Sequence, residues 1–101
     1  MITSVDELID SVERQDQPPE GLSEGMRALW FTKKGRWEDA HDIAQDIETN
    51  LGSWIHAHLH LIEGDQWNAG YWYSRAGKPE SGPDGIVEEW LAIAEEALNQ
   101  S

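Results

Sequence analysis

A six-residue stretch occurs twice in this chain, as Gly35-Arg36-Trp37-Glu38-Asp39-Ala40 and again as Gly64-Asp65-Gln66-Trp67-Asn68-Ala69. The second copy begins 29 residues after the first, and in both an alanine follows the glycine by five positions. Glycine can turn the chain where a helix ends, and alanine lets paired helices approach closely. The repeat therefore predicts two consecutive helical hairpins in the middle of the chain.

The first hairpin is expected at residues 19–49, from the spacing of the apolar residues around the first copy. Its first helix is expected to start near Pro19, because proline suits the first turn of a helix, and to end at Gly35. Its second helix is expected to run from Trp37 to about Thr49.

The second hairpin is expected at residues 53–77, after a turn at residues 50–52. Ser53 is a suitable N-cap for a helix that reaches Glu63. Asp65 is a suitable N-cap for the helix that completes the hairpin.

Two further helices are expected to flank the hairpins. Ser4 and Glu7 form a capping box at the start of a helix over residues 4–15. An apolar stripe predicts a C-terminal helix over residues 84–99, with Asp84 as its N-cap and a capping role at the end of the stack. No stretch alternates between apolar and polar residues over strand length. The 101 residues are therefore expected to form one all-α domain of about six helices.

Acidic residues outnumber basic ones by 20 to 7, which gives a formal net charge of −13. This charge repels nucleic acid and anionic lipid, so neither is an expected partner. The acidic pairs Glu88-Glu89 and Glu95-Glu96 are expected to lie on the solvated surface. The chain has no cysteine, which excludes disulfides and thiolate metal sites. No apolar run reaches the roughly 20 residues of a membrane span, and the acidic start carries no secretory signal, so a cytoplasmic protein is expected.

Three of the four histidines are expected to face one another. On a helix, His56, His60 and Glu63 share one narrow sector. His41 and Gln45 lie four positions apart on the preceding helix and are expected to face that sector. The sequence thus predicts a polar pocket in a tryptophan-rich shell, with these ligand-binding candidates: His41, Gln45, His56, His60, Glu63, Asn68, Trp72 and Tyr73.

Three interpretations of this pocket stay open. It could be a buried hydrogen-bond network that fixes the helix register, or a pocket for a small molecule or peptide. It could also be a metal site formed by His41, His56 and His60, because histidines four positions apart with a nearby carboxylate suit zinc. The glutamate of a zinc protease is missing between His56 and His60, and the chain has no phosphate-binding loop or nucleophile elbow. Burial is expected to lower the pKa of at least one of these histidines.

The spacing of glycine and alanine resembles the tetratricopeptide class, whose helix pairs join at a glycine followed five residues later by an alanine. This resemblance covers about residues 22–76 and implies a stack of antiparallel helix pairs; the class has a longer period of about 34 residues. The chain is also similar, over about residues 29–77, to a family of small bacterial proteins, which implies a shared fold and site but no known activity. The matching residues are Ala40-His41, Gln45, Trp54-Ile55-His56-Ala57-His58-Leu59-His60, Glu63-Gly64-Asp65, Asn68-Ala69, Tyr71-Trp72-Tyr73 and Arg75-Ala76-Gly77.

The leading expectation for function is a non-enzymatic binding or scaffold module, because stacks of helical hairpins commonly present a groove to a peptide. Its partner would be a peptide, a protein or a small molecule. The alternative is a small metal-binding protein, or an enzyme, built on His41, His56 and His60.

Overall fold

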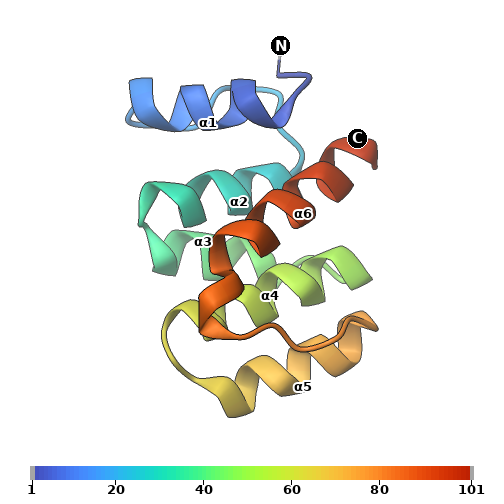
Figure 1. The fold of residues 1–101 in the computed structure, drawn as a ribbon. Helices are drawn as coiled ribbons and strands as arrows, with labels where there is room; N and C mark the ends of the chain where they lie inside the picture. Colours follow the sequence, from blue (N-terminus) through green and yellow to red (C-terminus); the bar gives the residue numbers. More distant parts are fainter. Residues whose placement is uncertain (1, 101) are drawn as a thin grey trace.

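The computed structural model describes residues 2–100, and every regular element in that range is helical (Figure 1). The expected all-α fold with six α-helices is confirmed. The elements are α1 (Val5–Arg14), α2 (Glu24–Lys34), α3 (Trp37–Ala44), α4 (Asn50–Ile62), α5 (Gln66–Ala76), a 3₁₀ helix η1 (Pro83–Gly85) and α6 (Ile86–Asn99).

The first five helices follow one another through a layered stack, from α1 at one end to α5 at the other (Figure 1). Consecutive helices pack together, above all α4 with α5 and α2 with α3. The C-terminal helix α6 returns across the stack and packs against α4, α2 and α1. It therefore lies along the flank of the other helices and not at the end of the stack, where the sequence had placed it as a cap.

Glycines end three of the hairpin helices, as the sequence predicts. Gly35, Gly64 and Gly77 have φ angles of 87°, 85° and 71°, in the left-handed region that ends helices. The side chain of Asp65 accepts a hydrogen bond from the Asn68 backbone N–H, as expected of an N-cap. Local chemistry thus fixes where the chain reverses.

Helix α2 begins later than the sequence predicts. Ser23, and not a residue near Pro19, is its N-cap, and the Ser23 hydroxyl accepts a hydrogen bond from the Met26 backbone N–H at 3.3 Å. Gly21 has a φ of +89°, which no helix interior allows. The prediction that the helix starts near Pro19 was wrong because the chain turns at Gly21.

The link between α3 and α4 also differs from the expectation. Helix α3 ends at Ala44 and not near Thr49, and α4 is already helical at Asn50 with Thr49 as its N-cap in place of Ser53. Gly52 lies in the first turn of α4, where an added Cβ would meet the Ile47 carbonyl oxygen at 2.2 Å. The segment between the helices crosses the start of α4 so closely that only glycine fits.

The N-cap of α6 also differs from the prediction. Asp84 was expected to cap this helix, but it lies inside η1, and the N-cap position is Gly85 without a side-chain hydrogen bond. The 3₁₀ turn leads directly into α6, so backbone geometry replaces the expected side-chain cap.

Helix α4 runs through the core, and each of its residues from Trp54 to Leu61 is buried. Because it is enclosed on all sides, polar residues on different faces of α4 enter separate buried environments. His56 and His60 lie on one face, and His58 lies on another. This arrangement divides the histidines of α4 between two clusters.

The buried tryptophans are held by hydrogen bonds as well as by packing. The indole N–H of Trp30 donates to the Ser11 hydroxyl at 3.0 Å, and that of Trp90 donates to the Leu29 carbonyl at 3.1 Å. Because these indole N–H groups have acceptors, the two tryptophans fill a large volume of the core without leaving a buried donor unsatisfied.

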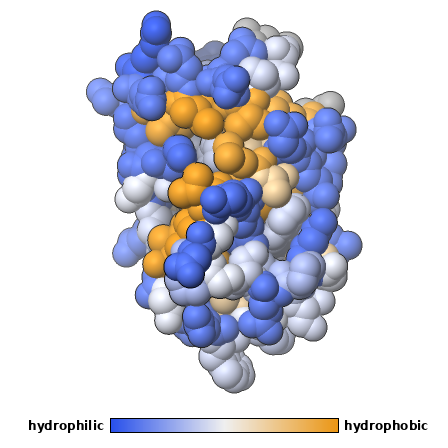
Figure 2. Space-filling model, in the orientation of Figure 1, coloured by the Kyte–Doolittle hydropathy of each residue, from blue (hydrophilic) through white to orange (hydrophobic). Residues whose placement is uncertain are grey.

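The face drawn in Figure 2 is largely hydrophilic, with hydrophobic residues gathered into one region. On α6, Val87 and Leu91 remain exposed. Within residues 2–100, no helix combines the length and the apolar character needed to cross a membrane.

Candidate functional site

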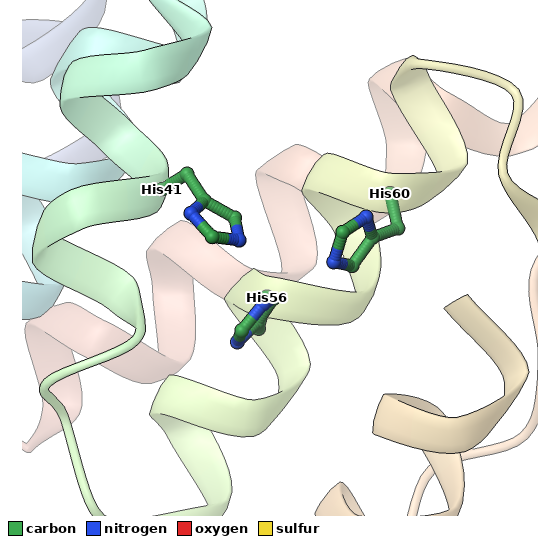
Figure 3. Close-up of side chains that lie close together, drawn as sticks. All are labelled: His41, His56 and His60. Atoms are coloured by element: carbon green, nitrogen blue, oxygen red, sulfur yellow. The ribbon is translucent and has the colours of Figure 1, made fainter. Parts of the chain in front are cut away.

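Three imidazole rings from two helices converge on one space. His41 comes from α3, and His56 and His60 come from successive turns of α4 (Figure 3). The ring centroids are 4.6 Å apart for His41 and His56, 5.0 Å for His56 and His60, and 5.5 Å for His41 and His60. One ring nitrogen of each lies within 4.8 Å of those of the other two. We refer to these three residues as the histidine cluster.

Two tryptophans flank the histidine cluster. The Trp72 ring stacks on His56 with centroids 3.9 Å apart, and the Trp37 ring stacks on His41 at 4.8 Å. The indole N–H of Trp37 donates to the Leu59 carbonyl at 2.7 Å, which fixes that ring in place. His56 is 6% exposed and His60 is 9% exposed. The stacked rings therefore hold the imidazoles in a largely dry setting.

The ring nitrogens of the histidine cluster are mostly uncommitted. His60 Nδ1 lies 2.7 Å from Oε1 of Glu63, which leaves its Nε2 available. His41 and His56 make no side-chain hydrogen bond to any residue in the range 2–100. A buried hydrogen-bond network would satisfy these nitrogens. Among the described residues, however, the fully buried side-chain atom without a hydrogen-bond partner is His58 Nε2, outside the histidine cluster, so the structural and the metal-binding interpretations both stay open.

The surroundings favour the neutral imidazoles. Burial, reinforced by the neighbouring His41 and His60, lowers the pKa of His56 from 6.5 to about 4. Burial and His60 also lower the pKa of His41, against the opposing effects of Asp42 and Glu63. The expected lowering is thus found for two histidines. Neutral imidazole with a free lone pair is the form that binds a metal ion.

Three of the predicted site residues lie outside the histidine cluster. Gln45 is exposed, just past the end of α3. Asn68 bonds to Asp65 through its side chain at 2.6 Å and serves the cap of α5. Tyr73 faces the other side of α4, where its hydroxyl donates to Glu89. Of the predicted site residues, the ones that lie together are the histidine cluster, Glu63 and Trp72.

A second polar cluster surrounds Glu89, which is only 7% exposed. Its carboxylate lies 2.6 Å from His58 Nδ1 and accepts hydrogen bonds from the Tyr73 and Ser81 hydroxyls, each at 2.6 Å, and from the Trp54 indole at 3.2 Å. Burial raises the pKa of Glu89, but the hydrogen bonds from His58, Ser81 and Tyr73 outweigh it and lower the pKa overall.

The expectation of a solvated Glu89 was wrong. Glu89 lies three positions after Ile86 and four before Ile93, on the apolar stripe of α6, and this spacing was the signal that could have revealed its burial. Its neighbour Glu88 is exposed as expected. Because contacts from Trp54, His58 and Tyr73 meet on one carboxylate, this cluster joins α6 to α4 and α5 and has the character of a structural node.

Neither a family model nor a curated protein nor a solved structure matches this chain. The function is therefore argued from the geometry of the histidine cluster.

Proposed function

We propose that this protein binds one divalent transition-metal ion, zinc in the first place, through His41, His56 and His60. The observation that carries the proposal is the convergence of three imidazoles whose ligand atoms lie within 4.8 Å of one another. Two of them make no hydrogen bond within residues 2–100, so no competing role occupies their nitrogens.

The donor set matches zinc chemistry. Zinc accepts neutral imidazole nitrogen at about 2.0–2.1 Å, and three protein ligands leave a fourth position open. The imidazoles must draw together to reach these bond lengths. His41 can supply this movement, because it is the least buried member of the histidine cluster.

Glu63 and Trp72 support the same function without binding the ion. A histidine ligand commonly donates its second ring N–H to a carboxylate, which sets the tautomer and orients the ring. The His60–Glu63 pair has this geometry, with Nδ1 toward the carboxylate. Trp72, stacked on His56, restricts the rotation of that ring. Both contacts prepare the site before the ion arrives.

A titration of metal-free protein with Co²⁺ tests the proposal. Tetrahedral Co²⁺ absorbs visible light, and the fluorescence of Trp37 and Trp72 reports the neighbouring histidines. We expect saturation at one ion per chain, and loss of this signal in His41→Gln and in His56→Gln. Circular dichroism of each variant confirms that the helices remain.

The chain has 20 acidic residues that could bind cations unspecifically. The variant Glu95→Gln, which alters an exposed carboxylate on α6, is therefore the matched control and should bind as the wild type does. Equal uptake by the wild type and both histidine variants would contradict the proposal, as would no uptake at all.

A further inference from the structure

A polar groove of about 350 Å³ lies next to the histidine cluster. It continues along the same helices: Gln45 follows His41 by four positions, and Ser53 precedes His56 by three. Trp72 belongs to both places, since it lines the groove and stacks on His56. The three histidines do not line the groove themselves, and Trp72 is the side chain that connects the groove to the histidine cluster.

Arg75 lines the groove and forms no ion pair with a carboxylate of residues 2–100. The other three arginines each form an ion pair with a carboxylate, as Arg14 does with Asp10. Arg75 has no such partner among residues 2–100, although the chain carries 20 acidic residues. Its guanidinium lies 5.2 Å from the centroid of the Trp72 ring and donates to the Tyr71 hydroxyl at 3.2 Å. These contacts hold Arg75 at the groove and leave its remaining donors free.

The neutral side chains of the groove are also hydrogen-bond donors. Gln45, Asn50 and Ser53 make no side-chain hydrogen bond within residues 2–100. The single acid of the groove is Glu48. These side chains can donate hydrogen bonds to a carboxylate, and arginine binds carboxylates with two parallel hydrogen bonds.

The metal ion adds a second point for an anionic oxygen. Three neutral histidines leave the full charge of a divalent ion uncompensated, so its open position favours an anionic ligand. His56 and the Arg75 guanidinium both contact Trp72, at 3.9 Å and 5.2 Å from its ring centroid, so one side chain links the histidine cluster to the cation of the groove. A ligand with an anionic group at each end could reach both.

We propose that the groove binds a small dicarboxylate, with one carboxylate on the metal ion and the other on Arg75. This inference rests on the proposed metal binding and names the class of ligand that completes the site. His56, buried and without a side-chain hydrogen bond in the described chain, is the cluster member that stacks on Trp72 of the groove.

The test uses Co²⁺-loaded protein and follows the visible spectrum while ligand is added. Acetate is compared with succinate, glutarate and adipate, which differ in the distance between their carboxylates. A charge-assisted hydrogen bond is worth enough for us to expect the best dicarboxylate to bind about tenfold more tightly than acetate. In Arg75→Gln this preference should disappear, whereas Arg14→Gln, which changes an exposed and distant arginine, should retain it. Glu48→Gln should strengthen the binding of dicarboxylates by removing the groove's like charge.

The outcomes separate the two proposals. A protein that takes up no Co²⁺ overturns the metal site and this inference together. A protein that takes up Co²⁺ but binds every dicarboxylate no better than acetate, or keeps its preference in Arg75→Gln, overturns the inference alone. Circular dichroism verifies the fold of each variant, and Arg75 is exposed, so its replacement removes no core contact.

Discussion

His60 Nδ1 and Glu63 Oε1 lie 2.7 Å apart across the last turn of α4, while the other two members of the histidine cluster have no carboxylate partner among residues 2–100. This contact fixes one imidazole with Nε2 free and leaves the other two to adjust around it. Because Trp72 restricts the His56 ring, His41 is the most adaptable ligand of a metal site built in this way. Glu63 is itself exposed, so its role can be tested without disturbing the core.

Replacing Glu63 with alanine should weaken metal affinity. Loss of the carboxylate frees the His60 ring to rotate. Loss of such a partner of a metal ligand typically costs 10- to 100-fold in affinity, so a loss of about that size is expected. Competition with a chelator of known affinity measures the change. Glu38→Ala, which removes an exposed carboxylate on α3, is the control and should leave affinity unaltered. Unchanged affinity in Glu63→Ala would show that the contact has no part in metal binding.

The metal-free protein should lose stability as the pH falls below about 6.5, in part because of His56. Its pKa is about 4 in the folded protein, below the ordinary value of 6.5. The unfolded chain therefore binds the proton first, and the free energy of unfolding decreases as pH falls between these two values. From pH 7.5 to about 5.5 the contribution is about 1 kcal/mol. His41, whose pKa is also lowered, acts in the same direction.

Urea denaturation in the presence of a chelator measures this effect, with His56→Gln as the comparison. Acidification also reduces the net charge of −13, which stabilises both proteins and cancels in the difference between them. The wild type should lose more stability than His56→Gln over this pH range. Identical pH slopes would mean that His56 does not titrate as its surroundings indicate.

Replacing Glu89 with alanine should destabilise the fold by about 3 kcal/mol or more, because each buried donor left without an acceptor costs about 1–3 kcal/mol. The change leaves the donors of Trp54, His58 and Tyr73 buried without an acceptor. Glu88→Ala changes the exposed neighbour and should stay within about 0.5 kcal/mol of the wild type. Chemical denaturation followed by circular dichroism compares the two. If the two variants have similar stabilities, Glu89 does not hold α6 to the hairpin formed by α4 and α5.

Replacing Gly52 with alanine should lower stability, although alanine normally favours a helix over glycine by about 1 kcal/mol. The new methyl group would meet the Ile47 carbonyl oxygen at 2.2 Å, so the segment before α4 must move. Gly82→Ala is the control, because no atom lies within 4 Å of its added Cβ. Thermal unfolding compares the stability of each variant with that of the wild type. A more stable Gly52→Ala would show that helix propensity outweighs this contact.

Local signals predicted the parts of this structure that local chemistry determines. The glycines that end α2 and α4 and the Asp65 cap act within a few residues, so the sequence reveals them directly. The prediction that His41, His56 and His60 face one another came from helical spacing together with the hairpin repeat, and their ring nitrogens do lie close together. These features depend on neighbours in sequence or on one repeated unit.

The remainder depended on contacts between distant segments. Tyr73 was placed with the histidine cluster because the position of α6 was unknown, and α6 supplies the carboxylate that Tyr73 actually meets. Glu89 was expected in solvent because glutamate is rarely buried, and only the crossing of α6 over α4 provides its donors. Gly52 looked like a turn residue because the close passage of Ile47 has no sequence signature.

X-ray absorption spectroscopy of the protein loaded with one equivalent of zinc tests the metal site most directly. The account predicts three imidazole nitrogens at about 2.0–2.1 Å and one further light ligand around the ion. In His56→Gln the imidazole scattering should fall or the zinc should be absent. A spectrum dominated by carboxylate oxygens, with no imidazole contribution in the wild type, would contradict the account.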